Sequence, residues 1–344
     1  MKIAPLMWES KLRPGVSTYL VHTGQHYDRQ MSELFFEQLG IPRPDIELEV
    51  GSGSHAVQTA EIMKRFEPVL LQQRPDIVLV VGDVNSTLAC SLTAAKLGIP
   101  IAHVEAGLRS FDRSMPEEIN RILTDAISDW LFVSEPSGVA NLIREGVSKN
   151  RIFFVGNVMI DTLLASRQRI EESPVLEHLQ LSDHGFAVLT LHRPANVDNL
   201  SVLAEVLDAI ERIQQEVTVV FPVHPRTKGK LESVLRHTMP NVRYTEPLGY
   251  LDFMKLVAHS RFVMTDSGGI QEETSVLGIP CLTLRNNTER PITIEKGTNV
   301  LVGLSSKSII SHSLKALNGL ERRPCVPELW DGKTSSRIMN VLAC

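Results

Sequence analysis

The sequence predicts an α/β fold of two doubly wound domains, and two observations carry that prediction. Length is the first, because 344 residues are too many for one ordinary domain and suit two of about 150. The second is that short, continuously apolar runs alternate with helical patterns, as in parallel sheets covered by helices on both faces. We expect a first domain over residues 1–165 and a second over residues 166–330.

The runs predicted to be strands are short and rich in β-branched and aromatic residues. In the first half they cover residues 17–22, 76–81, 99–104, 130–133 and 151–155. In the second half they cover residues 186–191, 217–223, 242–245, 261–265 and 280–284. The polar, helical stretch 163–184 lacks any strand signal and is predicted to connect the two domains.

Composition and charge narrow the class of protein. Hydrophobic residues make up 43% of the chain and charged residues 22%, which is typical of a globular protein with substantial cores. The net charge of −5 argues against nucleic acid as the main partner, although local basic clusters suit a small anionic ligand. The four cysteines are scattered without metal-ligand spacing, which indicates a reducing, cytoplasmic setting. Apolar runs such as "IVLVV" are too short to span a membrane, so no membrane partner is expected.

Polar residues follow most of the predicted strands, where open α/β sheets bind their ligands. In the first half these segments are "GDVNST" and "EAGLRSFDRSMPEEINR", which offer carboxylates. In the second half they are "HRPANVDN", "HPRTKGK", "DSGGIQEE" and "RNNTERP", which offer histidine, arginine and a glycine pair. The simplest arrangement has the two domains facing each other across a cleft. The second domain would then hold an anionic leaving group and the first would supply acid and base chemistry.

Each acid of the first half has a functional and a structural interpretation. Asp83 follows a glycine at a strand end, where it is either a site residue or a helix cap. Glu105 directly follows an apolar strand, so partial burial can tune it for proton transfer, although an ion pair with Arg109 is the alternative. The segment "SMPEEINR" offers two more acids after Pro116, a pattern that is also typical of a helix start.

The second half offers cationic and phosphate-binding groups. His192 and Arg193 follow a strand, and the parallel pair in "PVHPRTK" favours a ligand-binding role over a buried structural histidine. "DSGGIQEE" is either a turn capped by Ser267 or a helix N-terminus that binds phosphate. Arg290 in "NNTERP" either completes that anion site or is a solvated side chain.

Several classes of site are disfavoured by the sequence. The histidines show no HxH or HExxH spacing, so no metal is expected. No GxGxxG follows a strand, so the sequence contains no recognisable binding motif for a nicotinamide cofactor. No cofactor is predicted. Neither a lysine-bearing P-loop nor a GxSxG turn is present.

Motifs along nearly the whole chain then point to one family. In order they are "TGQHYD" (23–28), "GDVNSTLA" (82–89), "HVEAGLRS" (103–110), "PEEINR" (116–121), "GNVMIDTLL" (156–164), "HRPANVDN", "PVHPRT", "DSGGIQEE", "NNTERP" and "DGKTSSRI" (331–338). Together they resemble the non-hydrolysing UDP-N-acetylglucosamine 2-epimerases, which share the two Rossmann-like domains of the GT-B architecture. The resemblance implies that residues 1–165 carry the catalytic acids, that 166–330 bind UDP, and that a C-terminal helix over 331–344 returns to the first domain.

The same resemblance assigns roles to individual residues. It implies that Asp83, Glu105 and Glu117 are catalytic acids and that His192 approaches the diphosphate and the reacting centre. The positions implied to contact the substrate are Lys2, Arg113, His192, Arg193, Leu248, Phe253, Ser267, Gly268, Gly269, Glu273 and Arg290. A second, activating substrate molecule is implied at Gln25, His26, Arg193 and His224.

Among the UDP contacts, Ser267, Gly268 and Gly269 are implied to bind phosphate with help from Arg290. Phe253 would lie beside the uracil, and Leu248, where some relatives have glutamine, would offer only its backbone. Glu273, one helical turn beyond Gly269, would accept hydrogen bonds from the ribose hydroxyls rather than face the phosphate. Glu272 is predicted only to favour the start of the helix.

The implied reaction is reversible inversion at C2 of UDP-N-acetylglucosamine, giving UDP-N-acetylmannosamine. UDP would be eliminated to leave 2-acetamidoglucal and then added back, without a redox cofactor. The resemblance further implies a cytoplasmic homodimer that serves cell-surface polysaccharide synthesis. The alternatives are a 2-epimerase of a modified UDP-sugar such as a 2,3-diacetamido uronate, a GT-B glycosyltransferase, and a non-catalytic binder of sugar nucleotides.

The start of the chain departs from the family pattern. Relatives begin with a strand and a loop of the type GTRPEAIKMAPL, whereas this chain opens "MKIAPL", so that Lys2 alone remains of the loop's basic residues. We expect the first strand and its glycine turn to be missing. Its absence would expose an apolar seam, at a cost of about 25 cal/mol per Å² of lost burial.

Overall fold

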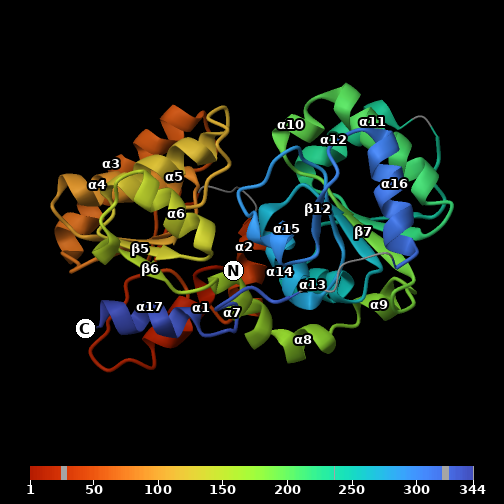
Figure 1. Ribbon diagram of the computed structural model, residues 1–344. Coiled ribbons are helices and arrows are strands. Elements are labelled where there is room, and N and C mark those ends of the chain that lie inside the picture. The colour runs from red at the N-terminus through yellow and green to blue at the C-terminus, as the bar shows by residue number, and fades with distance from the viewer. Residues whose placement is uncertain (25–28, 236, 320–324, 344) are drawn as a thin grey trace. The chain divides into compact units, whose positions relative to one another are not determined.

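The computed structural model describes residues 1–24, 29–235, 237–319 and 325–343. Its internal contacts divide the chain into two compact units, Met1–Leu164 with Glu328–Cys344, and Ala165–Pro327 (Figure 1). Each unit is built on parallel strands with helices packed against them, so the predicted α/β class is confirmed. None of the described helices combines the length and apolar character needed to cross a bilayer.

The first unit holds a parallel sheet in the order β3-β4-β5-β6 and a separate parallel pair, β1-β2. Its strands are β1 (Val21–His22), β2 (Ile46–Glu47), β3 (Val78–Val81), β4 (Ile101–Ala106), β5 (Trp130–Val133) and β6 (Ile152–Phe154). Its helices are α1 (Ala4–Ser10), α2 (Arg29–Gln38), α3 (His55–Gln73), α4 (Asn85–Lys96), α5 (Pro116–Ile127), α6 (Pro136–Arg144), α7 (Val158–Ala165) and α17 (Thr334–Leu342), with a 3₁₀ turn at Lys149–Arg151.

Two apolar layers cover the first unit's sheet. On one face Ile62 and Phe66 of α3 pack with Ala94 of α4 against Val80 of β3. On the other face α1 and α17 contact each other and pack against β4 and β5 through residues such as Leu6 and Ile338 (Figure 1). The central strand β4 is therefore buried on both sides, which agrees with its continuously apolar start.

The prediction of a strand over residues 17–22 is wrong for most of its length. Only Val21–His22 pair with a neighbour, the two-residue strand β2, which was not predicted. Just before β1, the Leu20 N–H donates to the Asp45 carboxylate (2.6 Å) rather than to a strand carbonyl. The Leu20 N–H is therefore bound to the Asp45 side chain and is not available to extend the β-ladder.

The second unit holds a six-stranded parallel sheet in the order β12-β11-β10-β7-β8-β9. Its strands are β7 (Phe186–Thr190), β8 (Thr218–Pro222), β9 (Val242–Thr245), β10 (Phe262–Thr265), β11 (Cys281–Thr283) and β12 (Asn299–Leu301). Its helices are α8 (Arg167–Glu171), α9 (Val175–His178), α10 (Pro194–Val197), α11 (Leu200–Ile213), α12 (Pro225–Val234), α13 (Tyr250–Ala258), α14 (Gly268–Leu277), α15 (Ile292–Glu295) and α16 (Ser306–Leu317). The edge strand β12 was not predicted; it begins with the polar Asn299, and its Val300 is exposed.

The strand order of the second unit creates a switch point between β7 and β10. The chain runs outward from β7 to β9 on one side and from β10 to β12 on the other. Helices α11 and α16 pack on one face of this sheet, while α13 and α14 lie on the other (Figure 1). Loops that leave β7 and β10 at their carboxyl ends diverge at the switch point, which is where such sheets bind ligands.

Candidate active site

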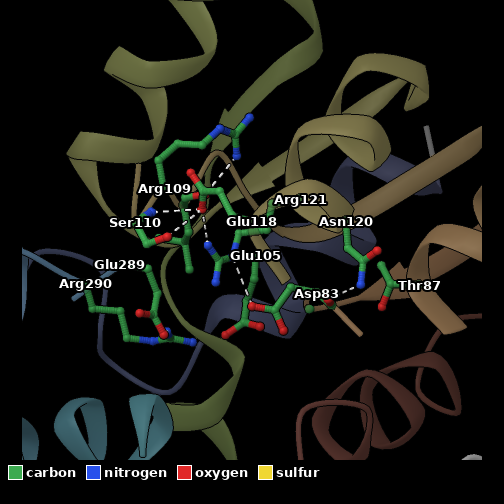
Figure 2. A network of polar contacts seen from close by, with 12 residues as sticks. Asp83, Thr87, Glu105, Arg109, Ser110, Glu118, Asn120, Arg121, Glu289 and Arg290 are labelled. Carbon is green, nitrogen blue, oxygen red and sulfur yellow. Dashed lines mark hydrogen bonds and ion pairs between the residues drawn. The ribbon is translucent and has the colours of Figure 1, made fainter. Parts of the chain in front are cut away.

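Asp83 follows Gly82 at the carboxyl end of β3, and the structure rules out its interpretation as a helix cap. Helix α4 begins two residues later with Val84 as its N-cap. Instead, Arg121 Nε of α5 donates to Asp83 Oδ2 (3.0 Å), and Asn120 Nδ2 donates to the Asp83 carbonyl (2.9 Å; Figure 2). Helix α5 therefore anchors this carboxylate at the strand end.

Glu105 is the second-to-last residue of β4. It is only 4% exposed, and its backbone lies in the left-handed region at φ 72°. The register against β5 shifts between Val104 and Ala106, which marks a bulge centred on Glu105. Its carboxylate pairs with the Lys2 ammonium group, and a Cβ on Gly82 would lie 3.4 Å from Glu105 Oε2. Such a backbone conformation costs about 1–3 kcal/mol for a non-glycine residue and is concentrated at functional sites.

The alternative that Glu105 forms an ion pair with Arg109 is wrong. Arg109 Nη1 lies 2.7 Å from Asp125 Oδ2, and Arg109 Nη2 lies 2.6 Å from Glu145 Oε2. Burial alone would lower the pKa of Arg109, but these two carboxylates raise it above its ordinary value.

The two acids of "PEEINR" have different surroundings. Glu118 is 1% exposed and accepts hydrogen bonds from the backbone N–H groups of Ser110 (2.9 Å) and Phe111 (3.0 Å). It also pairs with Arg121, so that one guanidinium joins Glu118 to Asp83 (Figure 2). Glu117 precedes it on the same turn and is partly exposed. The buried Glu118 therefore holds the loop at Ser110 and Phe111 in place. Glu117, by contrast, is accessible to a ligand.

His192 follows β7, and its orientation is set by the first residue after β10. His192 Nδ1 lies 2.8 Å from Asp266 Oδ1, while the His192 side chain is 42% exposed and Asp266 is fully buried. The Asp266 carboxylate also accepts from the Arg193 N–H (2.9 Å) and from Asn196 Nδ2 (3.1 Å). Burial raises the pKa of Asp266, but the hydrogen bonds and charge of His192 outweigh it and bring the pKa below its ordinary value. Asp266 thus joins two loops at the switch point and leaves His192 Nε2 as the outward nitrogen.

Helix α14 starts at the glycine pair, but Ser267 does not cap it with its side chain, so that structural interpretation is wrong. A Cβ on Gly268 would lie 2.7 Å from Glu289 Oε1 and 2.8 Å from Arg290 Nη1. A side chain at position 268 would therefore displace the ends of these two side chains, which the loop after β11 brings against the helix start.

Arg290 is 4% exposed, so the alternative of a solvated arginine is also wrong. Its Nε lies 2.7 Å from Glu272 Oε1, which corrects the prediction that Glu272 only favours the helix start. Its Nη1 lies 2.5 Å from Glu289 Oε1. Glu289 also contacts Arg285 (2.8 Å) and Arg193 (3.5 Å), and although burial raises its pKa, these arginines hold that pKa far below its ordinary value.

Glu273 lies beside a tyrosine, whereas the preceding Glu272 lies beside an arginine. Glu273 is fully enclosed, and Tyr250 Oη of α13 donates to its Oε1 (3.1 Å). Burial, with a contribution from the charge of Glu272, raises the pKa of Glu273 to about 8 despite the Tyr250 hydrogen bond, which lowers it. A carboxyl group that is largely neutral near pH 7 suits hydroxyl partners rather than cations.

The remaining predicted residues lie at several places. Leu248 is half-buried in the loop between β9 and α13, Phe253 is half-buried on α13, and Arg113 is exposed in the loop before α5. His224 is the N-cap of α12, with its ring centroid 5.9 Å from that of His192. Gln25 and His26 lie outside the described residues.

The family model described as UDP-N-acetylglucosamine 2-epimerase matches residues 9–343. The chain belongs to this family.

Relatives within the 2-epimerase family support the assignment over the whole chain. The UDP-N-acetylglucosamine 2-epimerase of Methanocaldococcus jannaschii is 40% identical over 99% of this chain and 95% of its own length. Its crystal structure in complex with UDP-GlcNAc and UDP has a TM-score of 0.90 and covers 99% of this chain and 96% of that one. The Neisseria meningitidis 2-epimerase bound to UDP-GlcNAc has a TM-score of 0.91 at 30% identity, covering 99% of this chain and 96% of that one.

A relative with a different substrate name matches equally well. The UDP-2,3-diacetamido-2,3-dideoxy-D-glucuronate 2-epimerase of Pseudomonas aeruginosa is 44% identical, over 95% of this chain and 92% of its own length. Overall similarity to members of the 2-epimerase family therefore does not choose between these two sugars.

Sequence reasoning missed several residues that build this 2-epimerase site. Asp266 and Glu289 were inside quoted motifs, and their places directly after a strand and next to an arginine were available signals. Arg121 was also inside a quoted motif, three residues from its partner Glu118, but its contact with Asp83, 38 residues away, carried no local signal. The contact of Tyr250 with Glu273, 23 residues away, carried none either. Among the described residues, no group of three or more His, Cys, Asp or Glu side chains is arranged to hold a metal ion.

Proposed function

We propose that this protein interconverts UDP-N-acetylglucosamine and UDP-N-acetylmannosamine by inversion at C2. The observation that carries the proposal is the buried Glu105, held in a strained conformation beside the β3 end that presents Asp83. Strained, buried acids at strand ends are typical of catalytic residues. Family relatives crystallised with UDP-GlcNAc support the same substrate.

The reaction proceeds by elimination and re-addition. A carboxylate removes the proton at C2 while the bond from C1 to the UDP oxygen breaks, which gives 2-acetamidoglucal and UDP. UDP then adds back to C1 while a proton arrives at the opposite face of C2. Two faces require two proton carriers, and we assign these roles among Asp83, Glu105 and Glu117.

The second unit supplies the groups for the departing UDP. We propose that His192 Nε2, Arg193 and the N-terminus of α14 at Ser267–Gly269 bind the diphosphate, with Arg290 contributing positive charge. Glu273 accepts from the ribose hydroxyls, while Phe253 and the Leu248 backbone contact the base. Lys2 and Arg113 complete the substrate contacts, and His224 with Arg193 belongs to a second, activating substrate site.

Proton NMR in D2O tests the proposal directly. Incubation with UDP-N-acetylglucosamine is expected to exchange the C2 proton for deuterium and to produce UDP-N-acetylmannosamine. Unchanged substrate without exchange, from protein shown to be folded, would refute the function.

A second candidate substrate is a UDP-2,3-diacetamido uronate, favoured by the 44% identity to the Pseudomonas aeruginosa enzyme. The same NMR assay with both sugars in separate tubes distinguishes the candidates. Turnover of the uronate at a higher kcat/KM than the N-acetylglucosamine substrate would overturn the first assignment.

We further infer that the protein is a cytoplasmic homodimer. Exposed apolar side chains support a protein partner for the first unit, with Val57 and Leu71 of α3 each 58% exposed and Leu123 of α5 46% exposed. Cytoplasmic residence is supported by the buried free thiols of Cys90 and Cys281. Sedimentation equilibrium of the wild type and of Leu71→Asp tests the dimer, which the charge should dissociate.

A further inference from the structure

One carboxylate holds the chain on both sides of Glu105. Asp125 of α5 is 1% exposed, and its Oδ1 lies 2.7 Å from Nδ1 of His103, two residues before Glu105. Its Oδ2 accepts from the backbone N–H of Gly107 (3.0 Å), two residues after Glu105. The left-handed backbone of Glu105 thus lies between two points that are fixed to the same side chain.

The His103 ring also contacts the end of the neighbouring strand β3. Its Nε2 lies 2.8 Å from the carbonyl oxygen of Gly82, the residue before Asp83. Both ring nitrogens therefore face oxygen atoms, so the ring lies between Asp125 of α5 and the turn that carries Asp83. Burial raises the pKa of Asp125, but His103 and Arg109 outweigh burial and keep the pKa lowered, so Asp125 stays ionised.

A strained backbone persists only where its surroundings impose it. We propose that Asp125, acting through His103 and the Gly107 N–H, is a positioning residue that holds Glu105 in its left-handed conformation at a fixed distance from the Asp83 turn. This role rests on the proposed function of Glu105 as a catalytic acid. Asp125 itself is fully buried and does not contact the substrate.

The first test separates catalysis from stability with a matched pair of variants. Asp125→Asn keeps the size of the side chain but cannot accept from His103 and Gly107 with both oxygens. Asp161→Asn is the control, because Asp161 is a buried acid of the same unit that accepts from the backbone N–H groups of Thr334 (3.1 Å) and Ser335 (2.7 Å). Both variants should lose stability.

Only Asp125→Asn should lose C2 proton exchange, with kcat lowered about a hundredfold, as expected for a small misplacement of a reacting group. Its affinity for UDP should stay near that of the wild type, because the groups proposed to bind the diphosphate, His192, Arg193 and the N-terminus of α14, belong to the other unit. A kcat for Asp125→Asn equal to that of Asp161→Asn, measured below both melting transitions, would overturn the positioning role.

The second test needs no activity, because it measures the backbone strain at Glu105. In the wild-type background Glu105→Gly should have an unfolding equilibrium constant about tenfold lower than Glu105→Ala, since only glycine adopts a positive φ without cost. In the Asp125→Asn background that ratio should fall to about one or reverse, because a relaxed backbone favours alanine. A ratio that stays tenfold would show that Asp125 does not impose the strain.

The two tests fail in distinguishable ways. If the wild type exchanges no UDP-sugar, the proposed function fails while the strain measurement still decides the role of Asp125 in the fold. If Asp125→Asn does not fold, the strain comparison is made in the His103→Asn background, which removes the ring contact with Asp125. The ratio should fall there as well, and a ratio that stays tenfold would contradict the positioning role.

Discussion

His192 Nδ1 lies 2.8 Å from Asp266 Oδ1, and this contact joins the loop after β7 to the loop after β10 at the switch point of the second sheet. The buried aspartate holds the Nδ1 side of the ring, so the outward position of Nε2 is defined before any ligand arrives. A partly exposed histidine is thereby given a fixed orientation by a residue that solvent does not reach.

Replacing Asp266 with asparagine should therefore impair catalysis through His192. We expect His192→Asn to lower kcat about a hundredfold and Asp266→Asn to lower it about tenfold or more, because a neutral amide no longer holds the ring with a charged acceptor and the ring orientation relaxes. Steady-state kinetics measure both effects. Asp198→Asn, which removes an exposed partner of Arg226 in the same unit, is the control and should retain wild-type rates.

The stability of the ligand-free protein should decrease as Glu273 is forced to ionise. Its pKa is raised from 4.5 to about 8 by burial, so the folded state binds a proton that the unfolded state releases. The resulting stability is complete below pH 4.5 and is lost as pH rises through about 8. Glu273→Gln should remove this dependence, with a difference on the order of a few kcal/mol at the high-pH end. Denaturant unfolding of both proteins across that range measures it, and parallel pH profiles would contradict the prediction.

Gly268→Ala should weaken UDP binding, because the added Cβ would meet Glu289 Oε1 at 2.7 Å and Arg290 Nη1 at 2.8 Å. Displacing these buried side chains should destabilise the protein by about 1–3 kcal/mol. Gly229→Ala is the matched control, since nothing lies within 4 Å of a Cβ there and the site is within helix α12. That variant should be neutral or gain about 0.5–1 kcal/mol. Thermal unfolding and UDP titration calorimetry distinguish the two variants, and equal behaviour would refute the steric argument.

Arg121→Lys should separate Asp83 from Glu118. The guanidinium contacts both carboxylates from one planar group, whereas an ammonium group at the end of a flexible chain cannot reproduce both contacts. We expect kcat to fall about tenfold or more while UDP affinity is retained. Arg212→Lys, in an exposed pair with Glu216, should leave the rate unchanged. Wild-type kcat in Arg121→Lys would show that the position of Asp83 does not depend on this contact.

Much of the fold was readable from local sequence. Strands β3 to β11 of the described chain lie at the predicted runs. The signal was strongest for strands such as β7 and β10, because burial on both faces leaves an unbroken apolar run. Strands β2 and β12 were missed, because β2 has only two residues, Ile46–Glu47, and β12 begins with the polar Asn299. Polar residues at strand ends were likewise visible, which is why Asp83, Glu105 and His192 could be selected.

The interaction partners of those residues could not be predicted from the sequence. The structural alternative paired Glu105 with Arg109, four residues away, but the fold places Glu105 with Lys2 and Arg109 with Asp125 and Glu145. Sequence distance carries little information here, because helix α5 packs across the end of β4 and brings its own charged residues to it.

Glu272 and Glu273 illustrate the difference between what the sequence determines and what the tertiary structure decides. The sequence by itself determined that two acids lie one turn inside a helix that starts after a strand, and that they differ by about 100° around it. Only the tertiary structure decided their chemistry, since Glu272 meets Arg290 from the loop after β11 and Glu273 meets Tyr250 from α13. Helical geometry is local and is set by neighbouring residues. The charge state of a buried carboxyl group is set by whichever distant elements enclose it.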